Sequence, residues 1–248
     1  MQDLITDLSP YLSMFDAFNI SQSRRCNNQA IHHVSYLICS AQFWTEYSVD
    51  IDNFRHLHHL TSRYTKIICN RNILVNLESL DIARNEHIQN ISDLTNLKSL
   101  VLENNFRIQD ISDMIHLTHL DILTNKYIRN IDTLTNLKSL ALSFCSKIKN
   151  ISSLTNLTSL DLTYNDAVKD ISHLTKLTRL NLDYNSVITN IDSLVNLTHL
   201  DLQNNQSILN IDLLTNLRTL FISVDNPLSE TAHALPSLKY INNIRIKF

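Results

Sequence analysis

Leucine and isoleucine recur along residues 77–224 at a fixed interval of 20 residues. The pair L-x-x-L appears first at Leu77/Leu80 and last at Leu217/Leu220. One complete unit reads LTSLDLTYNDAVKDISHLTK. A fixed interval of this length predicts a repeat protein, because each unit is too small to bury its hydrophobic side chains alone and must stack on its neighbours.

Each unit contains the pattern L-x-L, which predicts a short strand because alternate residues of a strand face the same side. Strands are expected at 100–102, at 120–122 and at every later interval, paired in parallel in the same 20-residue register. Two isoleucines follow, as at Ile108 and Ile111, and are expected to reach into the core. The Ser or Asp that comes next should N-cap a short helical turn. It occupies positions 92, 112, 132, 152, 172, 192 and 212.

An asparagine follows each strand, and its amide can satisfy backbone groups that a turn leaves unpaired. The column comprises Asn85, Asn105, Asn125, Asn165, Asn185 and Asn205. Cys145 replaces the asparagine in one unit, as a small buried polar residue. The sequence therefore predicts a polar column at the end of the strands.

These features resemble the leucine-rich repeat, over residues 77–224 without a gap and with a degenerate unit at 57–76. The resemblance implies an α/β fold: a leucine-rich-repeat solenoid with a parallel concave sheet of at least eight strands, and a small helical N-terminal segment in front of it. Single turns or extended chain are expected on the convex side. The expected parts are a helical segment at 1–45, a degenerate first repeat at 46–76, eight repeats at 77–224, and a closing strand or cap at 225–248.

The chain contains no glycine and 29 asparagines among its 248 residues. Asparagine is the next-best residue for left-handed backbone conformations, so it can take turn positions that glycine would otherwise fill. The lack of glycine excludes P-loop, GxGxxG and GxSxG motifs. The bias fits an AT-rich coding genome, such as that of a large DNA virus.

The formal net charge of −3 and the lack of a basic tail argue against a nucleic-acid partner. No apolar run approaches the ~18 residues of a membrane span, and the N-terminus has no signal-peptide pattern. The four cysteines have neither zinc spacing nor the density of a disulfide scaffold, so reduced thiols are expected. We therefore expect an intracellular monomer in the cytoplasm or nucleus (of a host cell if the source is viral), with no cofactor and no membrane partner.

One outward strand column is acidic. It comprises Asp81, Asp121, Asp161 and Asp201, with Asn181 completing the row. Leucine-rich repeats present such residues on the concave sheet, where a protein partner would bind. The column could be a solvated feature of the motif, or it could steer a basic segment of the partner.

A second column, directly before the asparagine, is aromatic in three successive repeats. Phe144, Tyr164 and Tyr184 are expected to lie one strand spacing apart and to form a contiguous ridge. Aromatic side chains are common anchors of protein interfaces. They could equally just cover the strand ends.

The 11 histidines show no HExxH motif and no zinc spacing with cysteines. His119 and His199 occupy outward strand positions, but nothing in the sequence pairs them with a nucleophile and an orienting acid. The sequence therefore predicts a non-enzymatic binding module without a metal site.

Residues 4–21, LITDLSPYLSMFDAFNIS, belong to no repeat. Their apolar residues have the spacing of an amphipathic helix through Phe15. Together with Asp16, Cys26 and Trp44, the order of residues resembles an F-box. The Leu-Pro that usually opens that motif is missing, and so is the tryptophan expected soon after the cysteine.

The F-box resemblance implies that the N-terminal segment binds a Skp1-like adaptor and that the repeats hold a protein substrate for ubiquitin transfer. The residues that would contact the adaptor are Leu4, Leu8, Leu12, Phe15 and Ile20. The alternative is a plain leucine-rich-repeat binding scaffold, in which these helices only cap the exposed end of the array.

Overall fold

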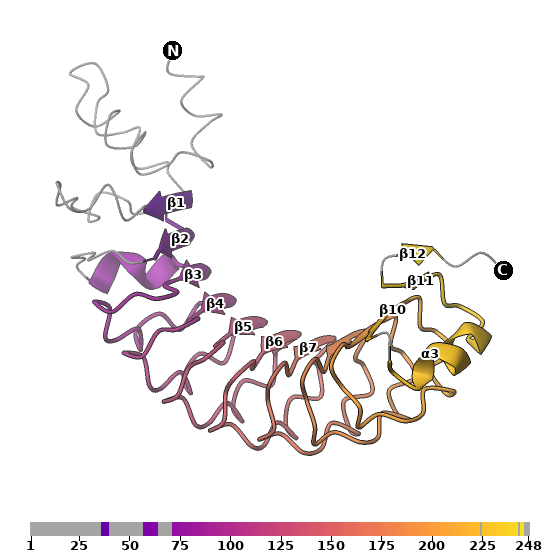
Figure 1. The fold of residues 1–248 in the computed structure, drawn as a ribbon. Coiled ribbons are helices and arrows are strands. Elements are labelled where there is room, and N and C mark those ends of the chain that lie inside the picture. Colours follow the sequence, from indigo (N-terminus) through magenta and orange to yellow (C-terminus); the bar gives the residue numbers. More distant parts are fainter. Residues whose placement is uncertain (1–35, 40–56, 64–70, 224, 243, 246–248) are drawn as a thin grey trace, which may run out of the picture. The chain divides into compact units, whose positions relative to one another are not determined.

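The computed structural model describes residues 36–39, 57–63, 71–223, 225–242 and 244–245. The chain divides into two compact units, Met1–Leu117 and Thr118–Phe248. In both units each coil has a short strand on one side and irregular turns on the other (Figure 1).

The described part of the first unit contains four parallel strands. They are β1 (Tyr36–Cys39), β2 (His59–Ser62), β3 (Ser79–Asp81) and β4 (Ser99–Val101). A 3₁₀ helix, η4 (Arg71–Asn76), lies between β2 and β3. From β2 onward the partners are 20 residues apart, with Leu60 opposite Leu80 and Leu80 opposite Leu100.

The second unit continues the same pattern. Its repeat strands are β5 (His119–Asp121), β6 (Ser139–Ala141), β7 (Ser159–Asp161), β8 (Arg179–Asn181), β9 (His199–Leu202) and β10 (Thr219–Ile222). Two short helices follow, α3 (Leu228–Thr231) and η5 (Ala232–Ala234). The strand β11 (Tyr240–Ile241) then pairs in parallel with β10, and β12 (Ile244–Arg245) pairs antiparallel with β11.

The strands form because one leucine in each repeat must be buried while its neighbours stay at the surface. Leu160 is buried, whereas Ser159 and Asp161 on either side of it are partly exposed. Burying a leucine contributes about 1.5–3 kcal/mol, and a slip of one residue would turn the whole set outward. The predicted parallel leucine-rich-repeat sheet with its 20-residue register is confirmed within each unit.

The strands lie one residue earlier than predicted. The prediction of 100–102 corresponds to β4 at Ser99–Val101, and that of 120–122 to β5 at His119–Asp121. The second leucine of the pattern, such as Leu102, is buried in the turn that follows the strand. The strands β9 and β10 differ, because they include the equivalent residues Leu202 and Ile222.

The side of each coil opposite the strand consists of two consecutive turns. The backbone N–H of Leu94 donates to the Ile91 carbonyl at 2.9 Å, and that of Leu97 donates to the Leu94 carbonyl at 3.2 Å. All three side chains are buried. Ile108 and Ile111 are buried as well, so the prediction that these two isoleucines reach into the core is confirmed.

The predicted N-cap at position 92 and its equivalents is wrong. The backbone N–H of Ser92 donates to the side-chain oxygen of Asn90 at 2.8 Å, so the capping group lies two residues earlier. The same bond runs from residue 112 to Asp110 and recurs in every later coil as far as Asn210. Asn and Asp side chains favour this local turn because they reach their own backbone two residues on.

An asparagine ladder joins successive coils. Its members, all buried, are Asn85, Asn105, Asn125, Asn165, Asn185, Asn205 and Asn226. The Asn165 Nδ2 donates to the carbonyls of Leu142 and Cys145 in the preceding coil at 2.8 and 2.9 Å. Its Oδ1 accepts the N–H groups of Ala167 and Val168 at 3.0 and 3.1 Å. One amide thus satisfies four backbone groups, each of which would cost about 1–3 kcal/mol if buried unpaired.

The ladder extends beyond the predicted column. Asn226 lies 21 residues after Asn205, one more than the repeat interval, yet its Nδ2 donates to the Asn205 carbonyl at 2.9 Å. Its Oδ1 accepts the N–H of Leu228 at the start of α3. The C-terminal cap is therefore tied to the last full coil by the same kind of bond.

Cys145 interrupts the ladder. Its Sγ lies 2.8 Å from the Ile122 carbonyl and is buried, as predicted for a small polar substitute. A thiol has no equivalent of the asparagine Oδ1. Among the described residues, no side chain accepts the N–H groups of Lys147 and Ile148, which correspond to the pair that Asn165 satisfies in the next coil.

The predictions for the N-terminal segment lie almost wholly outside the described residues. This holds for Leu4, Leu8, Leu12, Phe15, Ile20, Asp16, Cys26 and Trp44. The described residues of the segment form the strand β1 rather than a helix, and Tyr36 is the partner of His59 on β2. The helical assignment of the other residues stays a prediction.

The substitution Cys145→Asn is expected to raise the free energy of unfolding by about 1 kcal/mol at neutral pH, because it supplies the missing acceptor. Urea unfolding followed by circular dichroism measures this. Cys145→Ser is the control: its shorter side chain restores no amide, so it should not stabilise the fold. A lower midpoint for Cys145→Asn than for the natural chain would contradict this account of the ladder.

The difference in the free energy of unfolding between Cys145→Asn and the natural chain should increase above pH 9. Burial raises the pKa of the Cys145 thiol from 9.0 to about 11. The folded state therefore holds its proton after the unfolded state has lost it. The free energy of unfolding of the natural chain is therefore not reduced by this titration below pH 9, and it falls as the pH rises toward 11. Cys145→Asn lacks this titration, so its unfolding midpoint should fall less over that range.

Candidate protein-binding face

The outward side of the sheet in the second unit, here called the sheet face, carries the residues that flank each buried strand leucine. The acidic column occupies it at the ends of alternate strands. Asp121 Oδ1 accepts the N–H of Leu123 at 3.0 Å, and Asp201 Oδ1 accepts that of Gln203 at 2.9 Å. Each carboxylate therefore closes the end of its own strand, a role that the column pattern did not predict.

Asp81 belongs to the first unit and has a different environment. Arg63 forms an ion pair with it, with the guanidinium Nη2 2.7 Å from Oδ2. Its Oδ1 accepts the N–H of Ala83. The predicted column therefore includes one carboxylate that already has a cationic partner within its own unit.

The aromatic residues Phe144, Tyr164 and Tyr184 form a stack, here called the aromatic ladder. The ring centroids of Phe144 and Tyr164 are 4.6 Å apart with an interplanar angle of 17°, and those of Tyr164 and Tyr184 are 4.2 Å apart at 11°. These spacings match the distance between neighbouring strands. The predicted contiguous ridge is confirmed.

The aromatic ladder is exposed although its rings pack on one another. Phe144 is 48% exposed, and Tyr164 and Tyr184 are 44% exposed. Desolvation, a hydrogen bond with the Tyr184 hydroxyl and the nearby Asp183 carboxylate raise the pKa of the Tyr164 hydroxyl. The two hydroxyl groups therefore lie together, close to the sheet face.

Each ladder residue has a left-handed backbone, with φ of 59° at Phe144, 51° at Tyr164 and 52° at Tyr184. A bulky residue is unfavourable there by about 1–2 kcal/mol, and asparagine is among the side chains that tolerate it best. The other repeats use smaller or more flexible residues at this position: Arg84, Asn104, Thr124 and Asn204. Each stacked pair contributes only about 0.5–1.5 kcal/mol, so stability alone does not account for three aromatic residues.

Three carboxylates gather beside the aromatic ladder and are here called the acidic trio: Asp161, Asp183 and Asp201. Asp161 and Asp201 are the register partners of Asn181 on the strands at either side. Asp183 follows Asn181 by two residues and was not among the predicted site residues. It lies in the turn, where the strand column gave no signal for it.

Burial raises the pKa of the Asp201 carboxyl, and the charges of Asp183 and Asp161 raise it further. The Asp161 and Asp183 carboxylates are therefore close enough to Asp201 for their charges to act on it. Asp161 Oδ1 also accepts the Ser143 hydroxyl at 2.9 Å, and Asp183 Oδ1 accepts the amide of Asn204 at 3.0 Å.

Basic side chains border the opposite edge of the sheet face. Burial, together with the positive charges of Arg179 and Arg218, lowers the pKa of His199. His119 and His199 each have Nδ1 2.9 Å from the hydroxyl of the preceding threonine. Neither contact supplies the nucleophile and orienting acid that a catalytic histidine needs.

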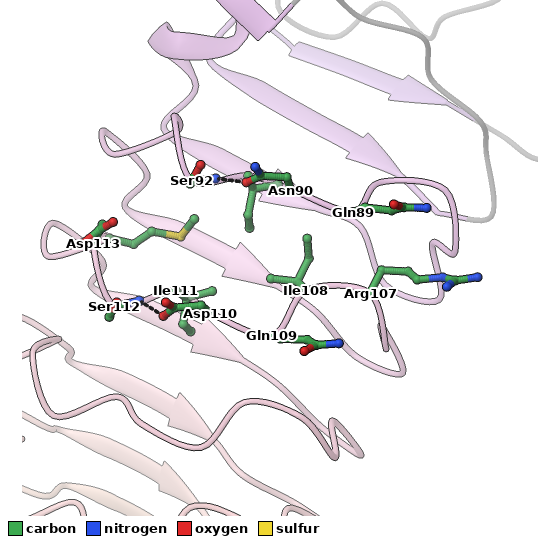
Figure 2. A pocket seen from close by; sticks show the side chains of 12 residues that line it. Gln89, Asn90, Ser92, Arg107, Ile108, Gln109, Asp110, Ile111, Ser112 and Asp113 are labelled. Carbon is green, nitrogen blue, oxygen red and sulfur yellow. Dashed lines mark hydrogen bonds between the residues drawn. The ribbon is translucent and has the colours of Figure 1, made fainter.

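A groove of about 330 Å³ lies between two coils of the first unit, on the side away from the strands (Figure 2). Its polar groups serve the local fold. Asn90 and Asp110 each accept the N–H of the serine two residues on, at 2.8 and 2.9 Å. The backbone bond from Ser112 is the main cause that lowers the pKa of Asp110. A similar groove between later coils is lined by Lys169, Asp170 and Asp192 among others, so this shape belongs to the repeat.

Within the described ranges, no cluster of three or more His, Cys, Asp or Glu side chains is arranged to hold a metal ion. No helix in that part of the chain has the length and apolar character to cross a membrane.

Comparison with solved structures gives leucine-rich-repeat neighbours. An internalin from Listeria monocytogenes is 29% identical, over 71% of this chain and 63% of its own, with a TM-score of 0.49. A leucine-rich-repeat protein from Leptospira interrogans is 19% identical, over 90% and 75%, with a TM-score of 0.54. The functional domain of InlJ from Listeria monocytogenes, which includes a cysteine ladder, is 19% identical over 92% and 68%, with a TM-score of 0.43.

The leptospiral structure supports the leucine-rich-repeat fold of this chain. The chain spans 63% of the first internalin, less than two thirds of its length. No family model and no curated protein matches the sequence. The F-box part of the resemblance and a viral origin gain no support from these comparisons.

The substitution Tyr164→Asn is expected to change the free energy of unfolding by less than about 1 kcal/mol, because relief of backbone strain offsets the lost stacking. Leu160→Ala in the same coil is the comparison and should cost about 2–5 kcal/mol. Both can be measured by urea unfolding. A loss for Tyr164→Asn as large as that for Leu160→Ala would mean that the aromatic ladder is there for stability.

Proposed function

We propose that this chain is a non-enzymatic protein-binding scaffold that holds its partner on the sheet face of the second unit, across the aromatic ladder. The observation that carries the proposal is the ladder itself: three stacked, exposed aromatic rings at backbone positions that disfavour them. Aromatic anchors supply much of the energy of protein interfaces. Leucine-rich repeats are a fold that serves binding by presenting strand residues on an open sheet.

The fixed geometry of the aromatic ladder supports the same proposal. Each ring is held by its neighbours and by a backbone that the turn constrains, so little side-chain freedom remains to be lost when a partner binds. Preorganisation of this kind favours affinity because ordering a side chain costs about 0.5–1.5 kcal/mol.

The finer form of the proposal is that the chain is a substrate adaptor of a Skp1-cullin-type ubiquitin ligase. Its support is the resemblance of residues 1–45 to an F-box and the number of apolar residues there, which exceeds what one capping face needs. An intracellular location would be consistent with this role and with the free thiol of Cys145.

The first test selects binders from a displayed library of random linear peptides against the full chain. Affinities of the selected peptides are then measured for the natural chain, for Tyr164→Ala and for Tyr184→Ala. Each tyrosine substitution should weaken binding by about 1–3 kcal/mol, as expected for interface anchors. Asp161→Asn should act mainly on the association rate and its salt dependence.

The matched control is the double variant Leu209→Asn/Leu213→Asn, which removes two exposed apolar side chains (71% and 54% exposed) from the turn side of the same unit. It should leave affinity unchanged. Peptides that bind both tyrosine variants normally but lose affinity for the leucine variant would place the binding surface on the turn side.

The adaptor proposal predicts that the full chain retains purified Skp1 in a pull-down and that the double variant Leu8→Asp/Leu12→Asp does not. Charged residues on the apolar face would prevent burial against the adaptor. The variant's circular dichroism spectrum checks that the repeats stay folded. Equal retention of Skp1 by both proteins, or retention by neither, would indicate that residues 1–45 only cap the repeats.

A further inference from the structure

The aromatic ladder exposes the edges of its rings, while the faces between neighbouring rings are covered. At 4.2–4.6 Å and 11–17° between planes, each ring covers the face of the next. The inner faces are therefore closed to a cation. What remains open is a narrow apolar strip along three coils, with the tyrosine hydroxyl groups beside it, and an aliphatic chain can lie along such a strip.

The carboxylates of the acidic trio beside this strip can accept further hydrogen bonds. Asp161, Asp183 and Asp201 accept their hydrogen bonds through Oδ1. Among the described residues, no donor reaches the Oδ2 atoms of the three, and no lysine or arginine forms an ion pair with them. The three residues are partly exposed, so a cation from outside can approach their carboxylates.

The charges on the sheet face are separated. Asp161 and Asp201 lie toward the ends of β7 and β9, and Asp183 lies in the turn after β8, whereas Arg179 and His199 begin β8 and β9. Arg179 precedes Asn181 by two residues, which corresponds to about 7 Å along a strand. A bound segment would therefore meet negative charge near the aromatic ladder and positive charge at the other edge.

We propose that the occupant of this face is an extended peptide segment with a lysine or arginine whose aliphatic stem lies along the edges of Tyr164 and Tyr184 and whose cation pairs with the acidic trio. This inference rests on the proposed function and names the chemistry of its partner. The argument for this occupant is charge complementarity. Partly buried carboxylates that lie close together repel one another, and a bound cation would relieve that repulsion. The same charges disfavour a nucleic-acid phosphate.

Charge deletion at the trio tests the inference in the full chain. Asp183→Asn and Asp201→Asn keep the Oδ1 acceptor, and the column already holds an asparagine at position 181, so both variants should fold. The selected peptides should be enriched in lysine and arginine, and each variant should weaken them at least tenfold at low salt. Asp212→Asn, which removes an exposed charge on the turn side, should leave affinity within twofold.

A charge exchange makes the test specific. The variant Asp183→Lys should lose the basic peptides, and a peptide with the same lysine replaced by glutamate should regain at least tenfold affinity for this variant over the natural chain. Peptides that depend on Tyr164 and Tyr184 but contain no basic residue, or that ignore the trio variants, would overturn this inference and leave the proposed function standing. Peptides that ignore the tyrosine substitutions as well would overturn both.

Discussion

The buried amide of the asparagine ladder is the interaction on which the coils depend, apart from the one that has Cys145 in its place. A coil of 20 residues must reverse direction after its strand, and that turn leaves backbone groups facing an apolar core. Because water cannot reach these groups, a side chain with both a donor and an acceptor has to form the hydrogen bonds that water would otherwise form. Asparagine is short enough to stay inside the turn, and its Nδ2 still reaches the carbonyls of the previous coil.

The same constraint fixes the conformation of the residue before each asparagine. The N–H of Asn165 donates to the Leu162 carbonyl at 3.0 Å, which closes the chain tightly after the strand. Tyr164 is then left-handed, and its own N–H donates to the Asp183 carbonyl of the next coil at 3.0 Å. Successive side chains at this position therefore leave the backbone in the same direction at strand spacing. The polar interior thus produces the geometry of the aromatic surface.

The period and the leucine positions were enough to predict the sheet, its register and the aromatic ridge, because burial of one leucine per strand allows few alternatives. Finer features depended on side-chain reach, which spacing does not reveal. Asn90 rather than Ser92 closes the outer turn, and Asp161 caps its strand as well as facing solvent. Asp183 was missed because it lies outside the repeated column, and Asn226 because its interval is 21 residues. The strand β1 was not predicted because its residues do not follow the repeat pattern.

Within each unit, asparagine amides that donate to the carbonyls of the preceding coil recur from coil to coil, and Cys145 is the exception. A gene segment that encodes one whole interval can therefore be duplicated or removed while every remaining amide still meets a carbonyl at the right height. The length of the sheet can therefore change during evolution by whole coils, and the aromatic and acidic columns can lengthen with it.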